Sequence, residues 1–203
     1  LILNIETLRF ADGDIAVSTL NLGRYLIGTD AAEALDGTPY DDYIAGEGGD
    51  DTIVGGEGRN RLLGEDGNDS ITSGSGDDYL LGGAGNDTLS GGDGADYLDD
   101  REGLDNLLLG GAGNDTIYVT GSADGGDGND YLYYQWQNGA SDDTVSGGTG
   151  NDTIYSTLSA STPLNIVLDG GDGNDSITGY SSYNYSGAEY MIGGDGNDTL
   201  LGY

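Results

Sequence analysis

The sequence contains no cysteine, no histidine and no lysine in its 203 residues. A chain without cysteine forms no disulfide and offers no thiol nucleophile, and without histidine it also lacks the usual ligands of a zinc site. Histidine, cysteine and lysine supply most of the bases and nucleophiles of catalysis. We therefore expect that this chain is not an enzyme.

Positive charge is almost as scarce, because five arginines face 37 Asp and Glu residues and leave a net charge of −32. So few cations cannot neutralise phosphates, which excludes nucleic acids and anionic membrane surfaces as partners. No hydrophobic run approaches a membrane-spanning length, so we expect no membrane insertion. The chain starts at Leu1 with neither an initiator methionine nor a signal peptide, and we expect it to be a segment of a larger protein.

Apolar side chains are also few. Leu, Ile, Val and Phe together make up about a fifth of the residues, while glycine alone occurs 41 times. A chain of this composition and charge cannot bury enough apolar surface to offset its backbone entropy and self-repulsion. We expect a bound cation to supply the missing stability.

A nine-residue unit, clearest at residues 82–90 (GGAGNDTLS), recurs through most of the chain. A glycine-rich hexapeptide ends in an acidic residue at position six, and an aliphatic residue follows at position eight. Position six recurs every nine residues from 33 to 105 and afterwards at 115, 130, 143, 152, 175 and 198. The position-eight residues of the fifteen units are Leu35, Ile44, Ile53, Leu62, Ile71, Leu80, Leu89, Leu98, Leu107, Ile117, Leu132, Val145, Ile154, Ile177 and Leu200.

One aliphatic residue in nine cannot form the apolar face of a helix, but it fits a short strand whose middle side chain points inward. Glycine in the preceding turn supplies positive φ, which Asn or Asp at position five also tolerates. Two strands and two turns make one flat coil. Stacked coils then predict an all-β fold, with the right-handed sense that parallel crossovers prefer.

We divide the chain into three parts. Residues 28–109 are predicted to form the strict-register stack, and residues 110–203 its continuation with longer strands and loop insertions near 119–124, 134–138, 156–169 and 179–192. Residues 1–27 carry apolar residues at strand spacing, including Ile5, Ile15 and Val17. They predict short strands that cap the first coil.

The chemistry lies at position six, where stacked coils would place one carboxylate above another. Like charges stacked at strand spacing repel, so the pattern favours a cation between each pair. Carboxylates and turn carbonyls suit Ca²⁺ better than Mg²⁺, and we predict about ten or more ions. The predicted side-chain ligands are Glu33, Asp42, Asp51, Asn60, Asp69, Asp78, Asp87, Asp96, Asp105, Asp115, Asp130, Asp143, Asp152, Asp175 and Asp198. The predicted carbonyl ligands are Gly56, Gly58, Gly83, Gly85, Gly92, Gly94, Gly111, Gly113, Gly126, Gly128, Gly148 and Gly150.

If each coil holds two units, alternate units share an edge. Asp87 would then lie between Asp69 and Asp105 and contribute to two sites. Sites that include Asn60 should be weaker, because an amide offers one oxygen and no charge. Beyond residue 115 the insertions leave the pairing open.

The unit Gly-Gly-x-Gly-Asn-Asp stands complete at 82–87, 110–115, 125–130, 147–152, 170–175 and 193–198. The chain resembles the RTX, or haemolysin-type calcium-binding, region of secreted bacterial proteins. The lead-in at residues 4–13 resembles segments that precede or separate such arrays. The resemblance covers residues 28 to 201 and implies a parallel β-roll, type I secretion, an extracellular location and folding triggered by calcium.

Ten of the fifteen tyrosines lie at or after Tyr118. Cross-strand ladders on the outer sheet face explain them. Self-association or glycan contact through a Tyr-rich face, aided by Trp136, is the alternative. For the whole module, the alternatives to a secretion-linked calcium-binding segment are a stalk or subunit of a filament, adhesin or surface layer, and an accessory module of a secreted hydrolase or polysaccharide-modifying enzyme.

Overall fold

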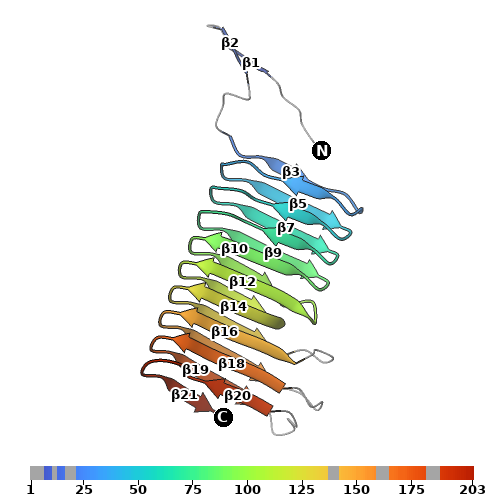
Figure 1. The fold of residues 1–203 in the computed structure, drawn as a ribbon. Helices are drawn as coiled ribbons and strands as arrows, with labels where there is room; N and C mark the ends of the chain where they lie inside the picture. The colour runs from blue at the N-terminus through green and yellow to red at the C-terminus, as the bar shows by residue number, and fades with distance from the viewer. Residues whose placement is uncertain (1–6, 11–12, 17–21, 137–141, 159–164, 182–187) are drawn as a thin grey trace.

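The computed structural model describes residues 7–10, 13–16, 22–136, 142–158, 165–181 and 188–203. From β3 onward these residues form short strands that follow one another coil by coil in a single stack, from β3 near the top of Figure 1 to β21 at the bottom. None of the described residues belongs to a helix that could cross a membrane.

Two sheets make up the stack, and the chain alternates between them. The described strands of the odd sheet are β3 (Tyr25–Ile27), β5 (Tyr43–Gly48), β7 (Arg61–Asp66), β9 (Tyr79–Ala84), β11 (Tyr97–Asp100), β13 (Thr116–Val119), β15 (Tyr131–Gln135), β17 (Thr153–Leu158), β19 (Ser176–Ser181) and β21 (Thr199–Gly202). Those of the even sheet are β4 (Ala34–Asp36), β6 (Thr52–Val54), β8 (Ser70–Thr72), β10 (Thr88–Asp93), β12 (Asn106–Ala112), β14 (Gly121–Asp127), β16 (Asp143–Thr149), β18 (Asn165–Asp172) and β20 (Ala188–Ile192).

Every strand of these two sheets pairs in parallel with the strand two positions away in the chain. In the early coils, Leu62 pairs with Leu80, and Ile71 with Leu89, so partners are one pair of nonapeptides apart. The predicted parallel β-roll with two repeats per coil is therefore confirmed.

The core is a thin double column of aliphatic side chains between the sheets. In β6 and β8 the central residue, Ile53 or Ile71, is buried while its two neighbours are exposed, which is the predicted pattern. At the two ends of the stack the column is open: Leu35 is half-buried and Leu200 is 42% exposed.

The predicted register is wrong at β12. Leu107 was expected to point inward, but its side chain is 41% exposed, while Leu108 is 0% exposed and pairs with Leu89. The turn before β12 contains one residue more than the earlier turns, and a slip of one residue turns each side chain to the other face.

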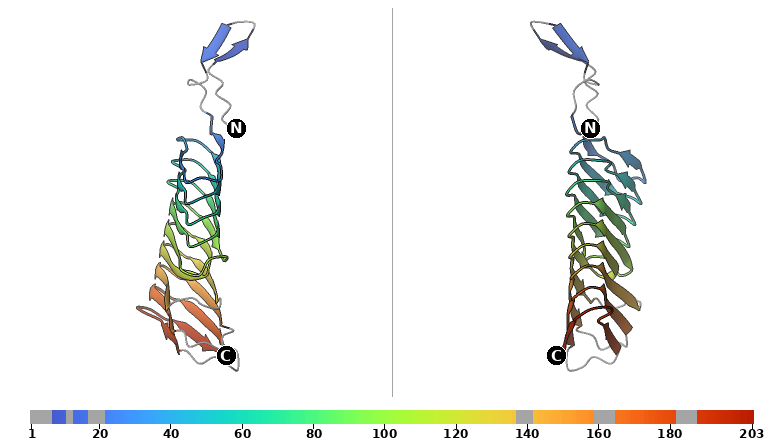
Figure 2. Two further views of the ribbon diagram at one scale, coloured as in Figure 1. Left: turned by 90° about the vertical axis from the view of Figure 1, so that its right-hand side faces the viewer. Right: turned by 60° about the vertical axis from the view of Figure 1, so that its left-hand side comes forward.

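The coils widen toward the C-terminal end (Figure 2). Strand β6 has three residues with one buried, whereas β17 has six and buries Ile154, Ser156 and Leu158. Tyr134 in β15 is fully buried as well. The larger C-terminal coils thus hold a wider core than the predicted single aliphatic per strand.

The N-terminal segment divides in two. Strands β1 (Thr7–Phe10) and β2 (Gly13–Ala16) form an antiparallel pair of their own, while β3 is the first strand of the odd sheet. Ile5 and Val17 lie outside the described residues, as do parts of the insertions predicted near 134–138, 156–169 and 179–192. The capping role of residues 1–27 stays a prediction.

Alanine substitutions at two neighbouring leucines test the register of β12. Leu108→Ala should lower the free energy of unfolding by about 2–4 kcal/mol, because it opens a cavity in the core. Leu107→Ala should change it by less than about 1 kcal/mol, because the side chain is exposed. Urea unfolding in excess calcium measures both, and equal losses would contradict the assigned register.

Candidate metal sites

The position-six residues line the two edges of the roll, where the chain turns from one sheet to the other. Hydrogen bonds between neighbouring coils join all of them except Asp105 and Asp143 into two rows. The backbone N–H of Asp69 donates to Oδ1 of Asp87 at 2.7 Å, and that of Asp51 donates to Oδ1 of Asp69 at 2.8 Å. Each carboxylate therefore uses one oxygen to join the coils.

The long edge, which leads from the even to the odd sheet, is unbroken. Its hydrogen-bonded row is Asp42, Asn60, Asp78, Asp96, Asp115, Asp130, Asp152, Asp175 and Asp198. The separation in sequence varies from 15 to 23 residues after Asp115, yet the bonds stay between 2.7 and 3.0 Å. The pairing left open by the sequence is thus a continuous row.

The short edge, which leads from the odd to the even sheet, ends early. Its row is Glu33, Asp51, Asp69, Asp87 and Asn106. Asp105 was predicted in this row, but the longer turn places Asn106 there, and the N–H of Asp87 donates to Asn106 Oδ1 at 2.9 Å. Asp105 is exposed.

Asp143 begins β16 on the short-edge side but belongs to neither row. Its register neighbour in β18 is Ile166, and its Oδ2 accepts a hydrogen bond of 2.8 Å from the hydroxyl of Tyr134. Burial raises the pKa of Asp143 to about 6, against the effect of that hydroxyl. The predicted ligand therefore has no stacked carboxylate among its described register neighbours.

The second carboxylate oxygen is the unusual feature of both rows. Oδ2 is buried and accepts no hydrogen bond in Asp51, Asp69, Asp78, Asp87, Asp96, Asp115, Asp130, Asp152 and Asp175. A buried polar atom without a partner costs about 1–3 kcal/mol, and more when it is charged. So many orphaned oxygens in two rows indicate that a positively charged group belongs beside them.

Burial also raises the pKa of these carboxyl groups, with a smaller contribution from stacked neighbours. The pKa of Asp69 and that of Asp152 rise to about 6, and those of Asp96 and Asp130 to about 7. Without a cation, the fold disfavours the charged form of these groups at neutral pH.

Asn60 replaces this charge with an amide, and its contacts show what surrounds the second atom of a position-six side chain. Nδ2 of Asn60 donates to the carbonyl oxygens of Gly56 and Gly58 and to Oγ of Ser73, each at 3.2 Å. In an equivalent turn with aspartate, Oδ2 would stand where Asn60 has Nδ2 and would face the carbonyl oxygens. A cation between these oxygens would remove their electrostatic repulsion, whereas at Asn60 the amide N–H groups do so.

The first position-six residue on each edge is also satisfied without a cation. Asp42 Oδ2 accepts the N–H of Thr38 at 2.6 Å, and Glu33 Oε2 accepts the N–H of Thr29 at 2.7 Å. The orphaned oxygens begin one or two coils later, at Asp51 and Asp78.

The glycines predicted as carbonyl ligands stand at positions two and four of the turns. All twelve have positive φ, from 90° at Gly58 to 147° at Gly94. At Gly56 and Gly58 the carbonyls point at the position-six side chain, as the contacts of Asn60 show. The ligand role of the other predicted carbonyls stays a prediction.

The position-one glycines were missed. A Cβ on Gly147 would lie 2.3 Å from Oδ2 of Asp152 and 2.6 Å from the carbonyl oxygen of Gly170 in the next coil. Gly64 has the same surroundings, with Asp69 Oδ2 and Gly82 O at 2.2 and 2.5 Å from its Cβ. The recurrence of glycine at position one was the available signal, and it indicates a second source of carbonyl ligands.

Position five has a role different from the predicted one. Among the described residues, positive φ outside glycine occurs at Glu47 and Glu65, which stand at position two. The position-five Asn side chains form an exposed ladder instead: Asn129 N–H donates to Asn114 Oδ1, and Asn151 N–H to Asn129 Oδ1, both at 2.7 Å.

The tyrosines stack along the outer face of the odd sheet. The rings of Tyr79 and Tyr97 lie 4.9 Å apart at an angle of 4°, and tilted contacts continue to Tyr118, Tyr131 and Tyr155. The predicted cross-strand ladder is therefore present.

Within the described residues, no three acidic side chains converge as they would at a metal site built from side chains alone. The carboxylates are spread along the two rows, so each site needs backbone carbonyls as further ligands. A set of oxygen ligands without nitrogen or sulfur fits a hard cation that accepts many oxygens, as Ca²⁺ does.

The model of the RTX calcium-binding nonapeptide repeat matches residues 27–62, 63–98, 102–139, 137–157, 167–182 and 183–203. The chain belongs to this family. It is an RTX calcium-binding repeat module with the β-roll fold, and proteins with these repeats are typically secreted by bacteria. Comparison with curated proteins gives no significant match.

A methyl group at position one should remove a cation. Gly147→Ala places a Cβ against Oδ2 of Asp152, so the variant should bind one Ca²⁺ fewer or bind it at least tenfold more weakly. Gly55→Ala is the matched control, because its Cβ meets the side chains of the amide site at Asn60. Elemental analysis of dialysed protein counts the ions, and an equal loss in both variants would contradict the assignment.

Acid should favour the metal-free roll. Since the folded-state pKa values lie above the unfolded value near 3.9, their contribution to stability is complete below about pH 4 and is lost as pH rises through 6 to 7. Metal-free protein should therefore gain β structure, followed by circular dichroism, between pH 7.5 and 4.5. A gain with rising pH instead would overturn this expectation.

Proposed function

We propose that this RTX module is disordered without calcium and folds when it meets extracellular Ca²⁺, as a structural, secretion-linked segment of a larger secreted protein. The orphaned Oδ2 atoms of the two rows carry the proposal. A fold that buries so many unpaired carboxylates is unstable by itself, and ions that bind only the folded chain add their binding energy to its stability.

The net charge of −32 supports the same coupling. About ten divalent ions would neutralise most of this charge, so the chain would be repulsive without calcium and compact with it. We assign the ions chiefly to the sites with orphaned oxygens, together with turn carbonyls. The ends of the rows, at Glu33, Asp42 and Asn60, would hold cations weakly or not at all.

A calcium titration of metal-free protein tests the coupling. At pH 7.5, circular dichroism should change from coil to β as calcium rises toward millimolar concentrations. Full β structure in the chelated protein would refute calcium-driven folding.

Asp130 offers a sharper test within the long edge. Asp130→Asn should raise the calcium concentration at the folding midpoint and lower the number of bound ions by one or two, because Asp130 stands between Asp115 and Asp152. Asp124→Asn removes a nearby exposed charge that also raises the pKa of Asp130, and it should leave the ion count unchanged. If both variants lost the same ions, net charge and not the row would be responsible.

The second candidate function is a stalk or subunit of an extracellular filament, adhesin or surface layer. It is favoured by the unbroken long edge, whose row from Asp42 to Asp198 joins the coils into one stack. Sedimentation with and without calcium distinguishes it, since a strict monomer at high concentration counts against assembly. Two further alternatives are an accessory module of a secreted hydrolase or polysaccharide-modifying enzyme, and a glycan-binding module that uses the tyrosine ladder.

A further inference from the structure

Asp100 stands at position one of its unit, where the earlier turns of the short edge have Gly28, Gly46, Gly64 and Gly82. Because Leu81 pairs with Asp99, Asp100 lies directly over Gly82 in the next coil. Its side chain is 1% exposed. A carboxylate therefore enters the interior of the roll at a place where the earlier turns of the short edge have only a hydrogen atom.

The carboxylate of Asp100 meets that of Asp87. A Cβ on Gly82 would lie 2.4 Å from Asp100 Oδ2 and 2.5 Å from Asp87 Oδ2, so both oxygens converge on one point. Neither of these oxygens accepts a hydrogen bond, and nor does Oδ1 of Asp100. Burial, followed by the facing Asp87 carboxylate, raises the pKa of Asp100 to about 9.

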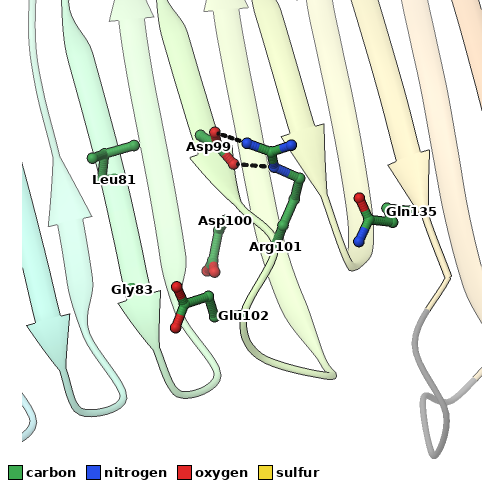
Figure 3. Close-up of a pocket in the computed structure, with 7 residues that line it drawn as sticks. All are labelled: Leu81, Gly83, Asp99, Asp100, Arg101, Glu102 and Gln135. Atoms are coloured by element: carbon green, nitrogen blue, oxygen red, sulfur yellow. Dashed lines mark hydrogen bonds and ion pairs between the residues drawn. The ribbon is translucent and has the colours of Figure 1, made fainter.

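The neighbouring arginine is directed elsewhere. Nε and Nη2 of Arg101 donate to the two oxygens of Asp99 at 2.7 and 2.6 Å, and the guanidinium lies over the ring of Tyr118 at 5.0 Å. Figure 3 shows this pair with Asp100 apart from it, next to Glu102. The charge of Arg101 is thus committed to Asp99.

Asp100 is one of the residues that line a cavity of about 380 Å³, together with Leu81, Gly83, Asp99, Arg101, Glu102 and Gln135 (Figure 3). The cavity is large enough for several waters, while the carboxylate oxygens of Asp100 are themselves buried.

Asn106, the last residue of the short-edge row, is an uncharged amide in the coil after Asp87. Its Nδ2 donates to the carbonyl oxygen of Asp100 at 3.3 Å and to Oγ1 of Thr120 at 3.2 Å, and Thr120 Oγ1 donates to the carbonyl of Gly103 at 2.9 Å. In the other turns the position-one carbonyl of the next coil faces Oδ2, but the carbonyl of Asp100 is already an acceptor. The Asp100 carboxylate takes its place.

We propose that Asp87 and Asp100 together hold one divalent cation, with Ca²⁺ as the expected ion, in a site of two carboxylates that terminates the short edge. This inference rests on the proposed function, since it concerns the same cations. The second formal charge makes this site stronger than those in which a carbonyl faces the aspartate, so it retains its ion longest during chelation.

Removal of the Asp100 carboxylate tests the site. Asp100→Asn and Asp100→Gly should each lose the tightest bound Ca²⁺ or weaken it at least tenfold, as measured by competition with a chromogenic chelator and by elemental analysis. Asp100→Gly restores the residue that other turns have, so it remains informative if the asparagine variant folds poorly. Asp124→Asn, which removes an exposed charge without breaking the Asp99–Arg101 ion pair, should leave the count and the tightest affinity unchanged.

The controls separate this inference from the proposed function. If Asp130→Asn loses an ion while both Asp100 variants keep the count and affinities of Asp124→Asn, the two-carboxylate site is refuted and the module still binds calcium. If the unaltered protein takes up no calcium, the proposed function itself fails. Loss of the tightest ion in both Asp100 variants, with the other ions retained, supports the site.

Discussion

The structure depends on buried aspartate oxygens that no hydrogen-bond donor reaches. In an ordinary protein such atoms would be removed by selection or paired with arginine, but this chain repeats them along both edges of its roll. One oxygen of each such carboxylate in the rows joins two coils through a backbone N–H, and the other is buried without a donor. On the proposed function, calcium would supply the partner that these oxygens lack.

Three residues of the rows support this view, because in each the second side-chain atom has a hydrogen-bond partner in place of a cation. Asn60 brings a donor on the same side chain, Asp42 receives the N–H of Thr38, and Asn106 donates to Thr120 and to a carbonyl. All three lie at or near an end of a row. Both rows therefore begin with residues whose side chains are satisfied by hydrogen bonds, and the orphaned oxygens follow them.

Much of this could be predicted from the sequence. The period of nine, the position-eight aliphatics and the position-six acids predicted the parallel roll, its two sheets and most of the rows, because strand, turn and ligand each have a distinct residue type. The slip before β12 could not be located, since Asp105-Asn106 and Leu107-Leu108 fit the pattern in either register. Both rows step by 19 residues there, from Asp87 to Asn106 and from Asp96 to Asp115, and only the packed core shows which leucine is inside.

Asp100 was missed for a related reason: a search for recurring residues passes over a residue that departs from the repeat. The two edges also differ in how they accommodate extra residues. Residues 136–142 and 159–164 fall between a strand of the odd sheet and the next strand of the even sheet, which is the short-edge side, while the long edge keeps its row intact across separations of 22 and 23 residues. One side of the roll can therefore lengthen freely in evolution or in protein engineering, whereas an insertion on the opposite side would disconnect two neighbouring coils.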